Sequence, residues 1–117
     1  MFRFEKLDVW HKAVDFATKV YSATVGFPVD ERFGLTSQMR RAAVSISSNI
    51  AEGSSRSSDG DFARFVEIAY GSLLEVVSQA AIARKQSFLP DDSFHDLYIH
   101  AEEVGRMLSG LRATLLK

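Results

Sequence analysis

The stretch RRAAVSISSNIAEGSSR, residues 40–56, joins an arginine pair to a helical apolar pattern, a glycine and a run of serines. With the residues before it, this stretch has apolar side chains at the spacing of one helix face: Leu35, Met39, Ala42, Ala43, Ile46 and Ile50. The pattern breaks at Gly53, and glycine is the residue best suited to the left-handed conformation just past a helix end. The stretch therefore predicts an amphipathic helix, with Gly53 as its stop, followed by a surface connection.

Three other segments have the same helical spacing, and both prolines, Pro28 and Pro90, lie between segments. The expected helices cover about residues 8–25, 30–52, 59–87 and 91–115. Short connections make successive helices run in opposite directions. We therefore expect an all-α fold, an antiparallel up-down-up-down four-helix bundle, with residues 1–117 forming a single domain.

The apolar faces differ in width. The face expected for the first helix consists of Trp10, Ala13, Val14, Ala17, Val20, Tyr21 and Thr24. The third helix has a main stripe from Phe62 to Ala80, and Ile68, Leu74 and Ile82 widen its apolar surface beyond one face. This breadth predicts that the third helix is buried on two sides.

The overall charge is close to neutral, with 14 basic and 15 acidic residues. No global positive field therefore draws the chain to nucleic acid or to an anionic membrane. The chain has no cysteine, which excludes disulfides, thiol nucleophiles and thiolate metal sites and fits a cytoplasmic location. No signal peptide or membrane-spanning run is recognised, so no membrane association is expected.

A polar line runs along the second helix beside its apolar stripe. Helical periodicity places Arg41, Ser45, Asn49 (or Ser48) and Glu52 on this line. If the second and third helices form a hairpin around residues 53–58, Arg41 lies near Tyr70 or Gly71, with Glu75 about one turn further on. We expect Arg41, or as a second choice Arg40, to pair with Glu75 or Glu67.

Gly71 lies in the middle of the third helix, where glycine costs about 1 kcal/mol relative to alanine. Its presence predicts a close approach by another backbone or side chain. We call the polar line the polar seam, and its candidate partner-binding residues are Arg40, Arg41, Ser45, Asn49, Glu52, Arg56 and Glu75. The seam either fixes the register of the helices or binds a polar ligand.

No set of residues predicts catalysis, and we expect no enzyme, no catalytic residue and no cofactor. Residues 53–56 lack the spacing of a phosphate-binding loop, and no strand precedes them. Two sets of residues with i, i+4 spacing are compatible with a metal: His11 with Asp15, and Asp92 with Asp96 and His100. Surface polarity explains both sets better, because the Glu-x-x-His motif of di-iron bundles is absent. The alternative function is a small-ligand or metal-binding bundle that uses the polar seam.

Three segments carry a resemblance to a known family: LDVWHKAVDF, GFPVDERFGLTSQMRRAAVSISSNIAEGSSR and FARFVEIAYGSLLEV. Over about residues 4–90 the chain resembles the bacterial four helix bundle protein family, also called the 23S ribosomal RNA intervening-sequence protein family. The fourth expected helix is similar to the family only in its general helical character, not in particular residues.

The resemblance implies an antiparallel four-helix bundle that assembles as a homopentamer and has no known enzymatic activity. Members are encoded within insertions in ribosomal RNA genes. A related branch, the accessory variability protein of diversity-generating retroelements, looks like a nucleic-acid-binding pentamer that also contacts reverse transcriptase. The functional hypothesis is therefore a non-enzymatic oligomeric scaffold or adaptor for RNA, DNA or a nucleic-acid-processing protein.

Overall fold

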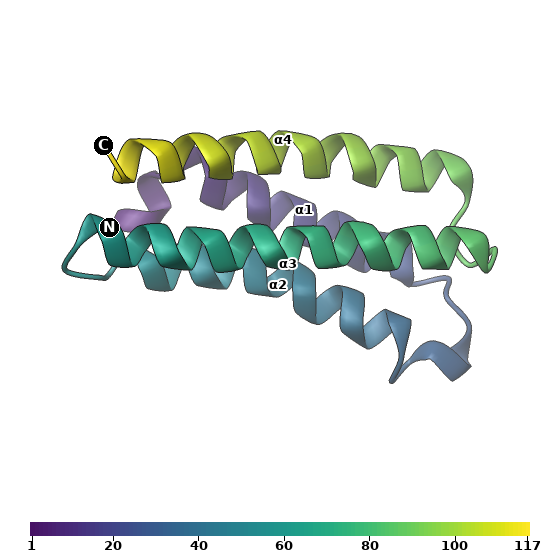
Figure 1. Ribbon diagram of the computed structural model, residues 1–117. Helices are drawn as coiled ribbons and strands as arrows, with labels where there is room; N and C mark the ends of the chain where they lie inside the picture. The colour runs from purple at the N-terminus through teal and green to yellow at the C-terminus, as the bar shows by residue number, and fades with distance from the viewer.

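The computed structural model describes all residues, 1–117, and consists of four long helices with two short 3-10 helices (Figure 1). The elements are η1 (Arg3–Lys6), α1 (Asp8–Thr24), η2 (Val29–Glu31), α2 (Leu35–Gly53), α3 (Asp59–Lys85) and α4 (Asp91–Leu115). The predicted all-α four-helix bundle is confirmed.

The four helices are arranged as the corners of a square. Each helix packs against the helices before and after it in the chain, and α1 also packs against α4. Neighbours run in opposite directions: along α1 and α4, for example, Lys12 pairs with Glu103 and Lys19 with Asp96. The bundle is elongated, with extents of 44 × 23 × 22 Å (Figure 1).

The core runs along the inside of all four helices. The stripe predicted for α2 is confirmed, because Met39, Ala42, Ala43, Ile46 and Ile50 are all buried. The face predicted for α1 is partly wrong. Phe16 is 1% exposed and belongs to the core, whereas Tyr21 is 44% exposed. Helix α1 is therefore rotated relative to the predicted face, toward the side that carries Val9 and Phe16.

Helix α2 begins later than predicted, at Leu35 instead of about residue 30, because η2 occupies residues 29–31. Gly34 precedes the helix and has no side chain to cap it. The Glu31 carboxylate does so instead, since Oε1 accepts a hydrogen bond from the Leu35 amide at 3.0 Å. At the start of α3, Ser58 caps the helix, with Oγ accepting a hydrogen bond from the Asp61 amide at 3.1 Å.

Helix α2 ends at Gly53, as predicted, but the left-handed conformation expected there is wrong. No glycine has a positive φ, and Gly53 is the last residue of α2, with the Ser54 amide still bonding to the Ile50 carbonyl. Instead, Gly53 lets α2 approach α3: an added Cβ would lie 2.6 Å from Phe65 Cβ and 2.8 Å from a Phe62 ring carbon. The glycine is required by packing between helices, not by backbone conformation.

Helix α3 has more apolar residues than its contacts with α2 and α4 bury. By length and composition it could cross a membrane, a property that core helices of bundles also have. Its inner side carries the buried residues from Phe62 to Ala83, whereas Ile68, Leu74 and Ile82 are about half exposed. Burial of α3 on two sides, which the sequence predicts, is therefore not reached within a single chain.

Candidate functional site

The polar seam is held together at its centre by three small side chains from α2 and α3. Asn49 Nδ2 donates to the Ser45 carbonyl at 2.8 Å and to Ser45 Oγ at 2.9 Å. Ser72 Oγ, from α3, donates to Ser45 Oγ at 3.0 Å. All three side chains are half-buried. The structure thus brings together Ser45 and Asn49, as predicted, and adds Ser72.

A second polar contact lies two turns away, around Gln79 of α3. Its side chain is only 8% exposed, and Nε2 donates to Gln38 Oε1 at 3.2 Å and to Glu75 Oε2 at 3.4 Å. The Gln79 Oε1 atom is buried and has no hydrogen-bond partner. Gln79 is not among the predicted seam residues, although its place between Val76 and Ala80 in the apolar stripe is a usable signal.

These contacts fix the register of α2 and α3. Ser45 lies opposite Ser72 and Gln38 opposite Gln79, so Arg41 falls opposite Val76. The hairpin count had placed Arg41 more than a turn earlier along α3, near Tyr70 or Gly71. The predicted register is wrong because it assumes a hairpin centred on residues 53–58. In the structure, Phe62 and Phe65 pack against Gly53, and this contact shifts α3 along α2.

The predicted ion pair across the seam is wrong. Arg41 is exposed and has no carboxylate within ion-pair distance. Glu67 pairs instead with Arg112 of α4, whose Nε lies 2.6 Å from Glu67 Oε1. Glu67 turns toward α4 because helical periodicity places it on the opposite side of α3 from Ser72.

Arg40, the second choice for that pair, faces α1 instead of α3. Its Nε donates to Thr24 Oγ1 at 2.9 Å, Nη2 donates to the Tyr21 carbonyl at 3.4 Å, and the guanidinium lies 4.7 Å from the centre of the Tyr21 ring. A cation beside carbonyls of the last turn of α1 is favourably placed in the helix dipole. Arg40 therefore stabilises the α1–α2 junction.

The prediction of a close approach at Gly71 is also wrong within the chain, because an added Cβ would meet nothing within 4 Å. The glycine that faces another helix in this region is Gly105 of α4, where an added Cβ would be in ordinary van der Waals contact with Leu73 at 3.4 Å and Tyr70 at 3.5 Å. The outward surface of α3 around Gly71 is open.

Glu52 and Arg56 lie at the end of the bundle where α2 meets α3. Both residues are exposed, and the Arg56 guanidinium lies 4.6 Å from the centre of the Phe65 ring. Arg3, from η1, lies 5.1 Å from the centre of the Phe62 ring and donates to the Ser54 carbonyl at 3.3 Å. Two arginines therefore cover neighbouring phenylalanines at this end. The structure does not bring Glu52 or Arg56 together with Glu75, which lies in the middle of α3.

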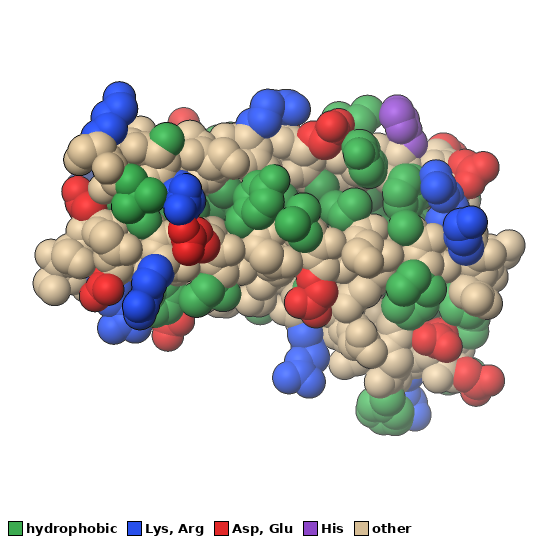
Figure 2. Space-filling model, viewed as in Figure 1, with side chains coloured by type: hydrophobic (Ala, Val, Ile, Leu, Met, Phe, Trp, Pro, Cys, Tyr) green, Lys and Arg blue, Asp and Glu red, His purple; other side chains and the backbone are tan.

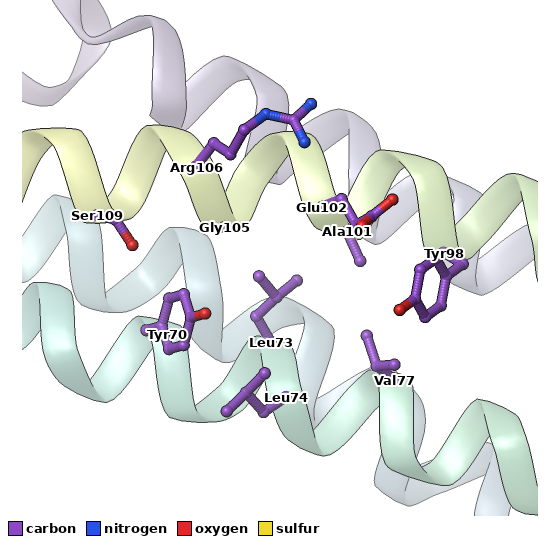
Figure 3. Close-up of a pocket in the computed structure, with 10 residues that line it drawn as sticks. All are labelled: Tyr70, Leu73, Leu74, Val77, Tyr98, Ala101, Glu102, Gly105, Arg106 and Ser109. Carbon is purple, nitrogen blue, oxygen red and sulfur yellow. The ribbon is translucent and has the colours of Figure 1, made fainter.

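An open groove of about 480 Å³ lies on the surface between α3 and α4, which pack against each other beneath it (Figure 3). Leu73, Val77, Ala101 and Gly105 are among its lining residues, and the lining residues that are exposed include Tyr70, Leu74, Tyr98, Glu102 and Arg106. Figure 2 shows the hydrophobic side chains gathered in a band along the line between α3 and α4. The groove is not among the predicted sites, but the extra apolar residues of α3 are a signal for it in the sequence.

The junction on the other side of α4, between α1 and α4, is crossed by ion pairs. Lys12 Nζ lies 3.2 Å from Glu103 Oε1, and Lys19 Nζ lies 3.3 Å from Asp96 Oδ2. His100 Nδ1 is 2.8 Å from the Asp96 carbonyl oxygen. The two i, i+4 sets considered for a metal do not assemble into one, and no group of three or more histidines and carboxylates could hold an ion.

Comparisons with known proteins agree with the four-helix fold. The model of the 23S rRNA-intervening sequence protein family matches residues 5–110. No protein of curated function matches the chain. A crystal structure of a protein with unknown function from the S23 ribosomal protein family of Bacteroides thetaiotaomicron is similar, with a TM-score of 0.79 and 20% sequence identity, over 89% of this chain and 97% of that one. The chain belongs to the 23S rRNA-intervening sequence protein family.

Proposed function

We propose that this protein is a non-enzymatic, cytoplasmic scaffold or adaptor that assembles as a homopentamer and binds a nucleic acid or a nucleic-acid-processing protein. The observation that carries the proposal is the uncovered apolar band between α3 and α4. In this band Tyr70 is 38%, Leu74 53% and Tyr98 43% exposed. Contiguous apolar surface on a water-soluble bundle marks a site of protein association.

The nucleic-acid part of the proposal is supported by the end of the bundle that carries Arg3 and Arg56. Both guanidinium groups lie over aromatic rings, and neither is in an ion pair with a carboxylate. An arginine held in this way keeps donors free for phosphate oxygens. One chain with a net charge of -1 has little attraction for a polyanion, but a ring repeats these cations around its axis.

The assembly is tested by measuring mass in solution by light scattering. We expect the mass of a pentamer, and the mass of a single 13.0 kDa chain at high protein concentration would overturn the proposal.

The nucleic-acid part is tested by binding to structured RNA and duplex DNA over a range of salt concentrations. We expect affinity to fall steeply with salt, because each phosphate contact releases counterions. Arg56→Gln should weaken binding and flatten the salt dependence. The matched control is Lys12→Gln on the α1–α4 side, which should leave binding unchanged. No binding to either nucleic acid at low salt would restrict the proposal to a protein partner.

The alternative, a metal or small ligand at the polar seam, predicts a different result. Elemental analysis of the purified protein would then show a stoichiometric transition metal, and mutation of Gln79 to Leu would release a bound polar ligand. Either finding would replace the scaffold proposal.

A further inference from the structure

We propose that the α3–α4 groove of one copy receives the α2–α3 polar seam of the next copy, with Arg41 meeting Glu102 across the contact. This inference rests on the ring assembly proposed above and specifies which surfaces form it. It also gives a role to the seam residues that do not interact within one chain.

The two surfaces have the relation that a small ring needs. A cyclic assembly joins two different patches on each subunit, and the angle between the patches decides whether the assembly closes or grows as a filament. In a square bundle, opposite sides would build a nearly straight filament. The seam side and the groove side are adjacent and share α3, so their use bends the assembly into a ring with α3 toward its axis.

The outward surface of α3 suits both contacts. Helical periodicity places Ile68 on the flank next to α2, Tyr70 and Leu74 on the flank next to α4, and Ile82 on the central line of the outward face. Between the flanks lie Gly71 and small Ser78, and around Gly71 there is open space. Apolar flanks beside a shallow centre allow a neighbouring helix to approach each side closely.

The charges on the two surfaces are opposite in sign and lie at the same height along the bundle axis. The contacts of Ser45 with Ser72 and of Gln38 with Gln79 set Arg41 level with Val76 of α3. On the other flank, Gly105 lies beside Leu73, which sets Glu102, three residues earlier, level with Val76 as well.

In a ring of parallel subunits at equal height, Arg41 of one copy therefore faces Glu102 of the next. Both side chains are exposed and neither is in an ion pair within its own chain. Glu75 of the seam lies next to Val76, and Arg106 of the groove lies one turn of α4 from Glu102, so they add a second pair of opposite charges whose levels differ by about three residues. A seam against a groove thus matches opposite charges, whereas a groove against a groove in parallel orientation would place Glu102 against Glu102.

Charge reversal tests the contact. Wild-type protein should have the mass of a ring, Arg41→Glu and Glu102→Arg should each lower the mass toward that of one chain, and the double variant should restore the ring. The matched control is Glu103→Arg on the α1–α4 side, which should leave the mass unchanged. A monomeric wild type overturns the proposed function. A ring that survives Glu102→Arg, or a double variant that stays dissociated, overturns only this inference.

Disulfide trapping gives an independent test, because the chain has no cysteine of its own. Ser48 on α2 and Ser109 on α4 are exposed and lie at the same level of the bundle, by the same counting. Mild oxidation of the variant with both Ser48→Cys and Ser109→Cys should give a ladder that ends at the closed ring. Each single variant should remain uncrosslinked. Dimers of the Ser109→Cys variant alone, or no ladder from an assembled double variant, would contradict the proposed contact.

Discussion

The two long sides of α4 differ in how they meet their neighbours. Against α1, the contact is crossed by Lys12–Glu103 and Lys19–Asp96. Against α3, one ion pair, Glu67–Arg112, lies near the end of the contact, and the middle opens into a groove rimmed by exposed tyrosine and leucine.

This difference separates a surface suited to water from one suited to a protein. Paired charges at the rim keep the α1–α4 side hydrated and soluble, and they add little stability. The α3–α4 side leaves apolar groups and unpaired charges exposed, an arrangement typical of association surfaces. How much each surface contributes to the stability of the subunit can be measured by mutation. The measurements are made in dilute solution, where the subunits are dissociated.

The largest effect is expected at Leu108, a fully buried residue on the inner face of α4 that serves both sides. Leu108→Ala should lower the free energy of unfolding by about 2–5 kcal/mol, because it removes buried methyl groups and leaves a cavity. Urea denaturation measures the change. Leu116→Ala, at a half-exposed position past α4, is the control and should change stability by less than about 0.5 kcal/mol.

Two glycines should respond in opposite directions. Gly53→Ala should destabilise the subunit by about 1–3 kcal/mol, because the added methyl group meets Phe62 and Phe65. Gly71→Ala should stabilise it by about 1 kcal/mol, because alanine favours the helix and nothing lies within 4 Å. Thermal unfolding of both variants measures the contrast. A destabilising Gly71→Ala would mean that the outward side of α3 is already covered within the chain.

The adjacent arginines should also differ. Arg40→Ala should cost about 1–2 kcal/mol, since it removes hydrogen bonds from a charged group and a cation–π contact with Tyr21. Arg41→Ala should change the stability of the subunit by less than about 0.5 kcal/mol, because Arg41 is an exposed side chain without a partner. Denaturation curves for the two variants would contradict this assignment if the order were reversed.

The smallest effect is expected at the ion pairs of the α1–α4 side. Glu103→Gln should lower stability by no more than about 1 kcal/mol, because both partners are about half exposed to water. The loss should shrink further as salt is added, since screening weakens the pair in the wild type. A loss that is independent of salt would indicate a packing role for Glu103 instead.

The sequence alone determines the helices and most of their buried faces. Helical hydrogen bonding and side-chain periodicity are local, so the α2 stripe from Met39 to Ile50 and the Ser58 cap could be predicted without the fold. The broad apolar surface of α3 was also visible as a pattern. The pattern did not locate the groove, because the groove forms between α3 and α4 and depends on how these two helices pack.

The tertiary structure alone decided which polar residues meet. The seam residues Ser45 and Asn49 were predicted, but Ser72 and Gln79, the partners of Arg40 and the freedom of Arg41 were not. These contacts depend on the relative translation and rotation of the helices. The packing of Gly53 against Phe62 and Phe65 sets that translation and rotation for α2 and α3. Periodicity fixes the face on which a side chain lies, whereas its partner is fixed by contacts between residues distant in the chain.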